Sequence, residues 1–208
     1  MIKKFNQNFR TKLWQKVSDI ENNSQAEIVV LVKSKSGHHE EAILINGGLL
    51  AMIVFTVIMF IPIDFGHMSI YMLPILSFFF GGAVARFLPS LQRIFISKSK
   101  LAKDTEISAR AIFQKAGLYH TTAKIGVLIY VSLFEKNVYI LADRGAENAI
   151  PAGEWEKMRR EFQEIFNSPD ISEALLSNLE KYQPIFAKYI PPIENDINEL
   201  PDNLEINL

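Results

Sequence analysis

The residues of this sequence that could carry out chemistry lie close together around residue 143. Asp143 and Glu147 are carboxylates four residues apart, directly after an apolar run. Carboxylate oxygens are the ligands that Ca²⁺ and Mg²⁺ prefer in proteins. Arg144 lies between them, and its guanidinium could bind a phosphate group. The segment therefore predicts a divalent-metal site with a phosphate-binding arginine, with an ordinary turn in which Asp143 caps exposed backbone N–H groups as the alternative.

Several other kinds of functional site are excluded by composition. The sequence contains no cysteine, which excludes disulfide bonds, thiolate metal sites and a cysteine nucleophile. It also lacks the glycine-rich phosphate loop, the GxSxG nucleophile turn and the GxGxxG dinucleotide turn. The formal net charge is −1, so no overall field attracts nucleic acid. We therefore expect no nucleic-acid partner and no cofactor other than a Ca²⁺ or Mg²⁺ ion.

Two long apolar segments in the middle of the chain predict a membrane anchor. Residues 42–63 carry no charged side chain, and residues 68–88 carry only Arg86, whose long stem can reach the lipid headgroups. As helices, both segments are roughly 30 Å long, which is about the thickness of the hydrocarbon core. A very short connection forces them into an antiparallel hairpin within residues 42–91. A re-entrant loop is the alternative, because Pro62 and Pro74 could break the helices.

Glycine pairs in the two spans predict how the hairpin packs. Gly47 and Gly48 precede the turn by about as many residues as Gly81 and Gly82 follow it. Equal rise per residue places both pairs at a similar depth in the membrane. Small residues let helix backbones approach closely in lipid, so we expect the two pairs to meet.

Basic residues at the ends of the hairpin predict its orientation. Lys33 and Lys35 precede the first span, and no Lys or Arg lies in the turn. The end of the second span and the residues after it carry a basic set expected to face anionic lipid headgroups: Arg86, Arg93, Lys98, Lys100 and Lys103. By the positive-inside rule, both ends of the hairpin face the cytoplasm. We expect a two-pass protein of the cytoplasmic (inner) membrane with both termini and the soluble domain inside.

The rest of the sequence predicts one small α/β domain in two parts, residues 25–41 and 92–189. Apolar runs at residues 26–32, 125–132 and 137–143 are typical of strands in a sheet covered by helices on both faces. The first strand cannot bury its faces alone, so we expect it to pair with the others across the hairpin. Residues 1–24 predict an amphipathic helix, docked on this domain or lying on a membrane surface, and residues 190–208 an acidic tail.

Three segments of the sequence resemble the TPM domain family, named for thylakoid lumen, photosystem II repair and acetylcholine receptor modulator proteins. They read AEIVVLV, ARAIFQKAGLYHT and IGVLIYVSLFEKNVYILADRGAE, and they are most similar to bacterial membrane-bound members. The resemblance implies a small mixed sheet flanked by helices. Some plant members are described as acid phosphatases that bind a divalent metal, whereas others act in assembly or repair of membrane complexes. Typical members end the third strand with Gly-Tyr-Gly, where this sequence has Ala142-Asp143-Arg144-Gly145.

The absence of a catalytic motif together with this resemblance favours a membrane-anchored, non-enzymatic interaction module. Such a module would serve the assembly or quality control of membrane proteins. A divalent-metal-dependent acid phosphatase is the first alternative, and an oligomeric hairpin that perturbs the bilayer is the second. The expected partners are the lipid bilayer and other membrane proteins, with a homo-oligomer as an open alternative.

Overall fold

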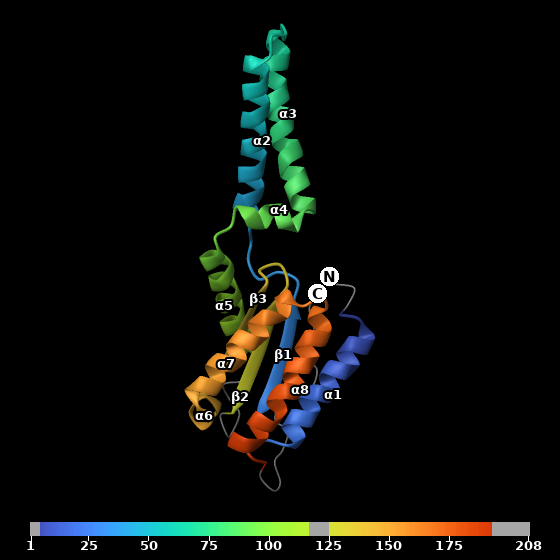
Figure 1. Ribbon diagram of the computed structural model, residues 1–208. Coiled ribbons are helices and arrows are strands. Elements are labelled where there is room, and N and C mark those ends of the chain that lie inside the picture. The colour runs from blue at the N-terminus through green and yellow to red at the C-terminus, as the bar shows by residue number, and fades with distance from the viewer. Residues whose placement is uncertain (1–4, 117–124, 193–208) are drawn as a thin grey trace. The chain divides into compact units, whose positions relative to one another are not determined.

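The computed structural model describes residues 5–116 and 125–192 and divides the chain into two compact units (Figure 1). Unit 1 comprises Met1–Ser36 and Ala102–Leu208, and unit 2 comprises Gly37–Leu101. Unit 2 therefore interrupts unit 1 in the sequence. The predicted acidic tail lies, from residue 193 on, outside the described residues.

Unit 1 is built around a three-stranded mixed sheet with the order β1-β2-β3. β1 (Glu27–Lys33) pairs in parallel with β2 (Gly126–Ser132), and β2 pairs antiparallel with β3 (Asn137–Ala142). The two halves of the domain thus meet between β1 and β2, on either side of unit 2 in the sequence. The predicted mixed α/β fold, with the first strand paired across the interruption, is confirmed.

One face of the sheet packs against the N-terminal and C-terminal helices. These are α1 (Gln7–Asn22), α6 (Arg144–Ala149), α7 (Ala152–Gln163), the 3-10 helix η3 (Glu164–Asn167) and α8 (Ile171–Tyr189). Alternate residues of the strands, such as Val30 and Ile129, join Trp155, Phe162 and Phe186 in one buried cluster. The amphipathic helix α1 contacts α8 and contributes Phe9 and Leu13 to the same cluster. This face holds the larger part of the core.

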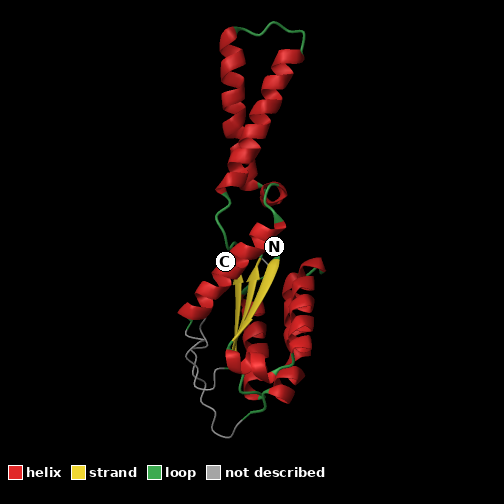
Figure 2. Ribbon diagram, turned by 90° about the vertical axis from the view of Figure 1, so that its left-hand side faces the viewer, coloured by secondary structure: helices red, strands yellow, loops and turns green. Residues whose placement is uncertain are grey.

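The opposite face of the sheet packs against α5 (Lys98–Lys115). Ala109 and Phe113 of this helix cluster with Val29, Leu128 and Tyr130 of the strands. Figure 2 shows the sheet with helices on both sides. Coverage of both faces explains why β1 and β2 are almost continuously apolar, since neither face meets water.

Unit 2 contains two long antiparallel helices, α2 (Glu40–Phe60) and α3 (His67–Phe87), followed by the short α4 (Pro89–Ile94). Helix α2 ends at Phe60, three residues earlier than predicted, because Pro62 disfavours helical backbone at Ile61, which is extended. Helix α3 continues through Pro74, so this proline does not break it. The short helix α4 was not predicted. It begins with Pro89, a residue favoured in the first turn of a helix.

Candidate functional site

Asp143, the first of the predicted metal ligands, caps helix α6. Its side-chain Oδ1 accepts a hydrogen bond from the backbone N of Arg144 at 2.7 Å. Its own backbone N donates to the carbonyl of Gly126 at 2.8 Å, which ties the residue to the start of β2. The second carboxylate oxygen, Oδ2, is buried and has no hydrogen-bond partner among the described residues. Asp143 is 5% exposed, so one lone acceptor atom is held inside the protein at the end of β3.

Arg144 and Glu147 lie in the first turn of α6, next to Asp143, and both are exposed. The backbone N of Glu147 donates to the carbonyl of Asp143 at 2.9 Å. Among the residues that the structure describes, no group of three or more His, Cys, Asp or Glu side chains could hold a metal ion. Two carboxylates with water would suit Mg²⁺, which commonly takes one or two carboxylates, better than Ca²⁺, which needs six to eight oxygens. The donor set thus fits a partly hydrated Mg²⁺ at most.

A polar network that the sequence analysis missed lies at the opposite end of the sheet. It gathers Ser36 after β1, Ser108 of α5, Tyr130 and Ser132 of β2, and Glu135 of the β2–β3 turn. Glu135 is 3% exposed, and Ser132 and Tyr130 are fully buried. The backbone N of Ser36 donates to both carboxylate oxygens of Glu135, at 3.0 and 3.1 Å. The network therefore joins the chain leaving β1 to the turn after β2.

The hydroxyl hydrogens of this network can be assigned from the carboxylate outward. Ser132 donates its single proton to Glu135. Ser36 donates to Ser132 at 2.7 Å, so it has no proton left for Tyr130. The contact of 2.8 Å between Ser36 and Tyr130 must then be a donation by the phenol. Burial raises the pKa of Tyr130 above its ordinary value, which keeps that proton on the ring oxygen.

All hydroxyl donors in the network therefore point toward one carboxylate. Tyr130 accepts at 2.9 Å from Ser108, which begins the chain of donors. Aligned hydrogen bonds of this kind polarise one another and hold a buried region in one geometry. The arrangement stabilises the end of β1.

A surface recess lies between α7, η3 and α8. It encloses about 290 Å³ and is lined by charged and polar side chains that include Glu161, Asn178 and Lys181. Lys181 Nζ and Tyr182 Oη both lie 2.7 Å from Oε2 of Glu161. Burial and the Glu161 carboxylate raise the pKa of Tyr182. The Glu161 carboxylate is thus paired with two side chains of the protein itself.

The glycines of the predicted hairpin contact do not all lie at the α2–α3 interface. A Cβ at Gly47 would meet the backbone oxygen of Phe78 at 2.6 Å, and a Cβ at Gly81 would meet Leu50 Cβ at 3.0 Å. A Cβ at Gly82 would lie 3.4 Å from Ile43, whereas one at Gly48 would meet nothing within 4 Å. The structure therefore brings Gly47, Gly81 and Gly82 to the facing helix, each opposite a larger residue, and leaves Gly48 outside the contact.

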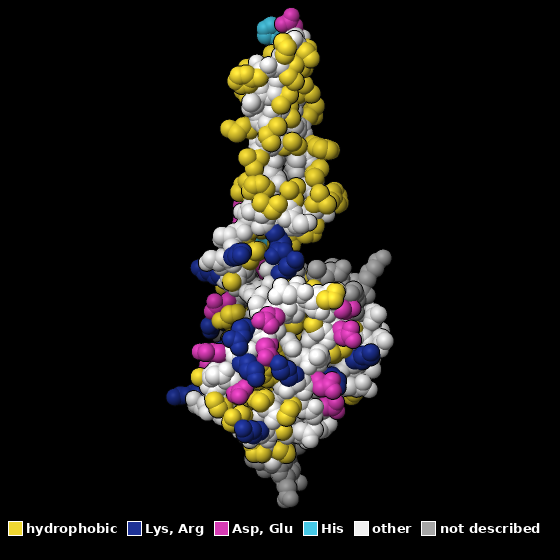
Figure 3. Space-filling model, in the orientation of Figure 1, with side chains coloured by type: hydrophobic (Ala, Val, Ile, Leu, Met, Phe, Trp, Pro, Cys, Tyr) yellow, Lys and Arg dark blue, Asp and Glu magenta, His cyan; other side chains and the backbone are white. Residues whose placement is uncertain are grey.

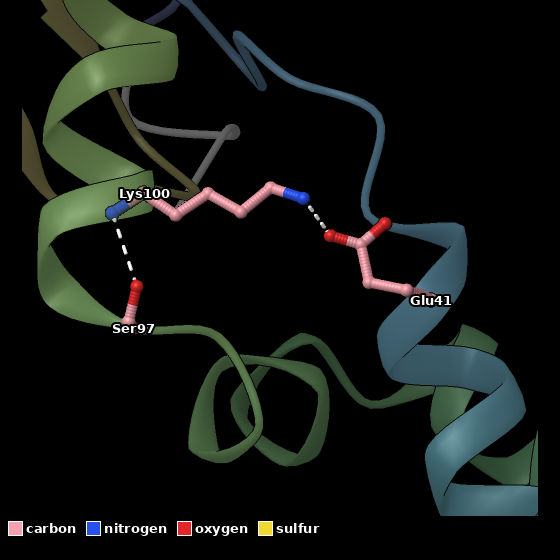
Figure 4. A network of polar contacts seen from close by, with 3 residues as sticks. All are labelled: Glu41, Ser97 and Lys100. Carbon is pink, nitrogen blue, oxygen red and sulfur yellow. Dashed lines mark hydrogen bonds and ion pairs between the residues drawn. The ribbon is translucent and has the colours of Figure 1, made fainter.

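The predicted basic set is divided between different environments. Arg86 and Lys98 are exposed, and Arg93 is half-buried, all within unit 2. Lys100 instead forms an ion pair with Glu41 at the start of α2, and its backbone N donates to Ser97 Oγ at 3.2 Å (Figure 4). Lys103 lies on the part of α5 that belongs to unit 1.

Comparison with known proteins supports the resemblance seen in the sequence. A family model for the TPM domain matches residues 92–183, and no curated protein matches the sequence significantly. The fold is similar to the NMR structure of the BA42 protein from the psychrophilic bacterium Bizionia argentinensis, with a TM-score of 0.58 and 19% identity over 97% of this chain and 93% of that one. At this identity the likeness shows the fold alone. Residues 92–183 run from α4 into α8 and so include β2, β3 and both helical layers, and the chain therefore carries a TPM domain, as its sequence predicted.

Proposed function

We propose that this protein is an integral membrane protein in which the α2–α3 hairpin anchors a TPM domain at the cytoplasmic face of the inner membrane. The anchored domain acts as a non-enzymatic interaction module in the assembly or quality control of membrane proteins. One observation carries the membrane part of this proposal. Most of the large apolar side chains of α2 and α3 are exposed on the surface of the hairpin and do not pack into a core.

Both helices are long and apolar enough to cross a bilayer, and only a small part of each is buried. In the most apolar stretch of α2 17% is buried, and in that of α3 11%. Phe60 is 84% exposed and Phe79 68%. Figure 3 shows apolar side chains along the whole length of the hairpin. Water-soluble proteins rarely expose a continuous apolar patch of more than a few hundred Å², whereas lipid tails favour such a surface.

Polar side chains within the two helices also suit a lipid environment. Thr56 Oγ1 donates to the carbonyl of Met52, and Ser77 Oγ to that of Pro74, both at 2.8 Å. Asn46 Nδ2 donates to the carbonyl of Ala42 at 2.7 Å. In hydrocarbon an unsatisfied polar group costs several kcal/mol. Each of these groups is bonded within its own helix and needs no water.

The orientation rests on the basic residues at the open end of the hairpin. Arg86 lies in the last turn of α3, and Arg93 and Lys98 follow that helix, whereas the turn between α2 and α3 contains Asp64 but no Lys or Arg. Positively charged flanks stay in the cytoplasm during insertion. Because both ends of the hairpin connect to unit 1, the TPM domain lies on the same side.

Alkaline extraction of membranes tests the anchor. The full chain is expected to stay in the membrane pellet at high pH, because two apolar helices buried in the bilayer do not depend on electrostatic interactions with the membrane surface. A variant in which a Gly/Ser linker replaces residues 42–88 is expected in the soluble fraction and folded. On both sides of the linker the chain returns to unit 1, where β1 pairs with β2, and closing a flexible loop costs little. Extraction of the full chain, or aggregation of the variant at every linker length, would contradict the proposal.

The buried, unpartnered Oδ2 of Asp143 supports a second candidate function, a divalent-metal-dependent acid phosphatase. Asp143 and Glu147 would hold the metal, which would polarise a phosphate ester, and Arg144 would bind the ester's anionic oxygens. The exposed position of Glu147 and Arg144 would let a substrate reach them.

An assay of the purified protein with a generic phosphate ester, with and without Mg²⁺, separates the two functions. We expect no metal-dependent turnover. Turnover that requires Mg²⁺ and is lost in both Glu147→Gln and Asp143→Asn would contradict the interaction module and support the phosphatase. Glu147→Gln is the more telling variant, because this exposed side chain is not the cap of α6. Its substitution should leave the fold intact.

A further inference from the structure

Helix α4 is fixed across the end of the hairpin. Figure 1 shows it lying crosswise to α2 and α3, and it contacts both of them. Gln92 of α4 is buried, and its Nε2 donates at 2.9 Å to the carbonyl of Ala85 in the last turn of α3. The last four carbonyls of a helix lack their usual partners within it. The Ala85 carbonyl accepts from the backbone N of Leu88 at 3.3 Å, and the bond from Gln92 adds a second donor that holds α4 in place.

The surface of unit 2 around α4 combines large apolar side chains with cations. Phe87, at the end of α3, is 82% exposed, and Ile94, at the end of α4, is 72% exposed. Arg86, Arg93 and Lys98 lie among them in sequence and form no ion pair with any carboxylate that the structure describes. Apolar and basic residues mixed in this way are typical of helices that lie in the interface between water and lipid.

Basic residues outnumber acidic residues at this end of unit 2. No Asp or Glu occurs between Asp64 and Asp104. Of the two acids that begin α2, Glu41 is already paired with Lys100 (Figure 4). Figure 3 shows Lys and Arg side chains gathered at the α4 end of the hairpin and none along its length. In the proposed membrane orientation, these Lys and Arg side chains therefore lie at the depth of the lipid headgroups.

We propose that α4 lies in the plane of the membrane surface and that Arg86, Arg93 and Lys98 bind the phosphate groups of anionic lipids. The proposal rests on the proposed membrane anchor and adds a lipid preference to it. A guanidinium matches phosphate with two parallel hydrogen bonds, and Phe87 and Ile94 would be immersed beside the headgroups. Each basic residue near an anionic surface shifts the equilibrium toward immersed α4 by about fivefold.

The test places a fluorophore that is sensitive to its environment at Ile94→Cys, in an otherwise cysteine-free chain. The full-length protein is reconstituted in vesicles of phosphatidylcholine with or without phosphatidylglycerol. We expect the label to be protected from an aqueous quencher in anionic vesicles and much less in neutral ones. Combined Arg86→Gln, Arg93→Gln and Lys98→Gln should abolish the difference, and added salt should reduce it.

Two controls make the result specific. A variant with the same change in net charge on unit 1, Lys115→Gln with Lys157→Gln and Arg160→Gln, should behave as the parent protein. A label at Met52→Cys, in the middle of α2, reports insertion of the hairpin itself and should be protected in both lipids and in every variant. Loss of protection at this position would contradict the membrane anchor.

Other outcomes would overturn the lipid proposal alone. With the Met52 label protected, equal protection of the label at residue 94 in both lipids would exclude an anionic-lipid site. The same conclusion would follow if the triple glutamine variant kept the difference between the two lipids. Protection only in native membranes, and not in anionic vesicles, would indicate an acidic protein partner in place of lipid.

Discussion

Replacing Glu135 by alanine is expected to lower the free energy of unfolding of unit 1 by about 2–6 kcal/mol. The substitution leaves the part-buried backbone N of Ser36 and the buried hydroxyl of Ser132 without their acceptor. A buried donor that loses its partner costs about 1–3 kcal/mol. Glu135→Gln keeps one acceptor oxygen and should have a smaller effect. Denaturant titration of the full chain in detergent, followed by fluorescence of the buried Trp155, measures the change.

Glu156→Ala is the matched control for this prediction. Glu156 is exposed on α7, and its replacement should change the free energy of unfolding by less than about 0.5 kcal/mol. If Glu135→Ala were as mild as this control, the network would be incidental to the fold. The hydrogen bonds from Ser36 and Ser132 to the Glu135 carboxylate would then contribute little to the stability of unit 1.

Gly47→Ala is expected to force α2 and α3 apart, whereas Gly48→Ala is expected to be tolerated. A Cβ at residue 47 would lie 2.6 Å from the backbone oxygen of Phe78, which cannot rotate away as a side chain could. Such overpacking typically costs about 1–3 kcal/mol. At residue 48 a Cβ would meet nothing within 4 Å, so only the higher helix propensity of alanine remains.

A disulfide between the two helices reports this difference in membranes. The ideal Cβ of residue 81 lies 3.0 Å from the Cβ of Leu50, just below the separation of about 3.5–4.5 Å in disulfides, so a small adjustment brings the two positions into range. Leu50→Cys with Gly81→Cys should therefore oxidise readily within one chain. Adding Gly47→Ala should suppress the crosslink, and adding Gly48→Ala should not. Equal yields in both backgrounds would refute the packing seen here.

Much of the fold could be predicted from the sequence, because long uncharged and apolar segments have few ways to be buried. The uncharged blocks before and after Asp64 predicted α2 and α3, and the β-branched runs predicted the three strands. The errors lie at element ends, where Pro62 ends α2 early. The two helices α4 and α6 are each six residues long, too short for a helical repeat of apolar residues to be visible.

The polar residues at one end of the sheet could be predicted from the sequence, whereas those at the other end could not. Asp143 was found because a carboxylate directly follows an apolar strand, and its buried position at the start of α6 agrees with a capping role. Glu135 was not predicted as a site residue, and it bonds to Ser36, which is 99 residues away in the sequence. Polar residues after two neighbouring parallel strands are the signal that could have pointed there. Only the pairing of β1 with β2 brings them together.

The membrane hairpin is tested most directly by the reactivity of single cysteines in intact spheroplasts. A membrane-impermeant maleimide should label Gly66→Cys in the turn from outside and should not label Met52→Cys or Phe79→Cys, which the proposal places within the bilayer. Glu147→Cys, on the exposed surface of unit 1, should react only after the cells are opened. Labelling of Met52→Cys in intact spheroplasts, or of Glu147→Cys before opening, would contradict a hairpin that spans the membrane with its TPM domain inside.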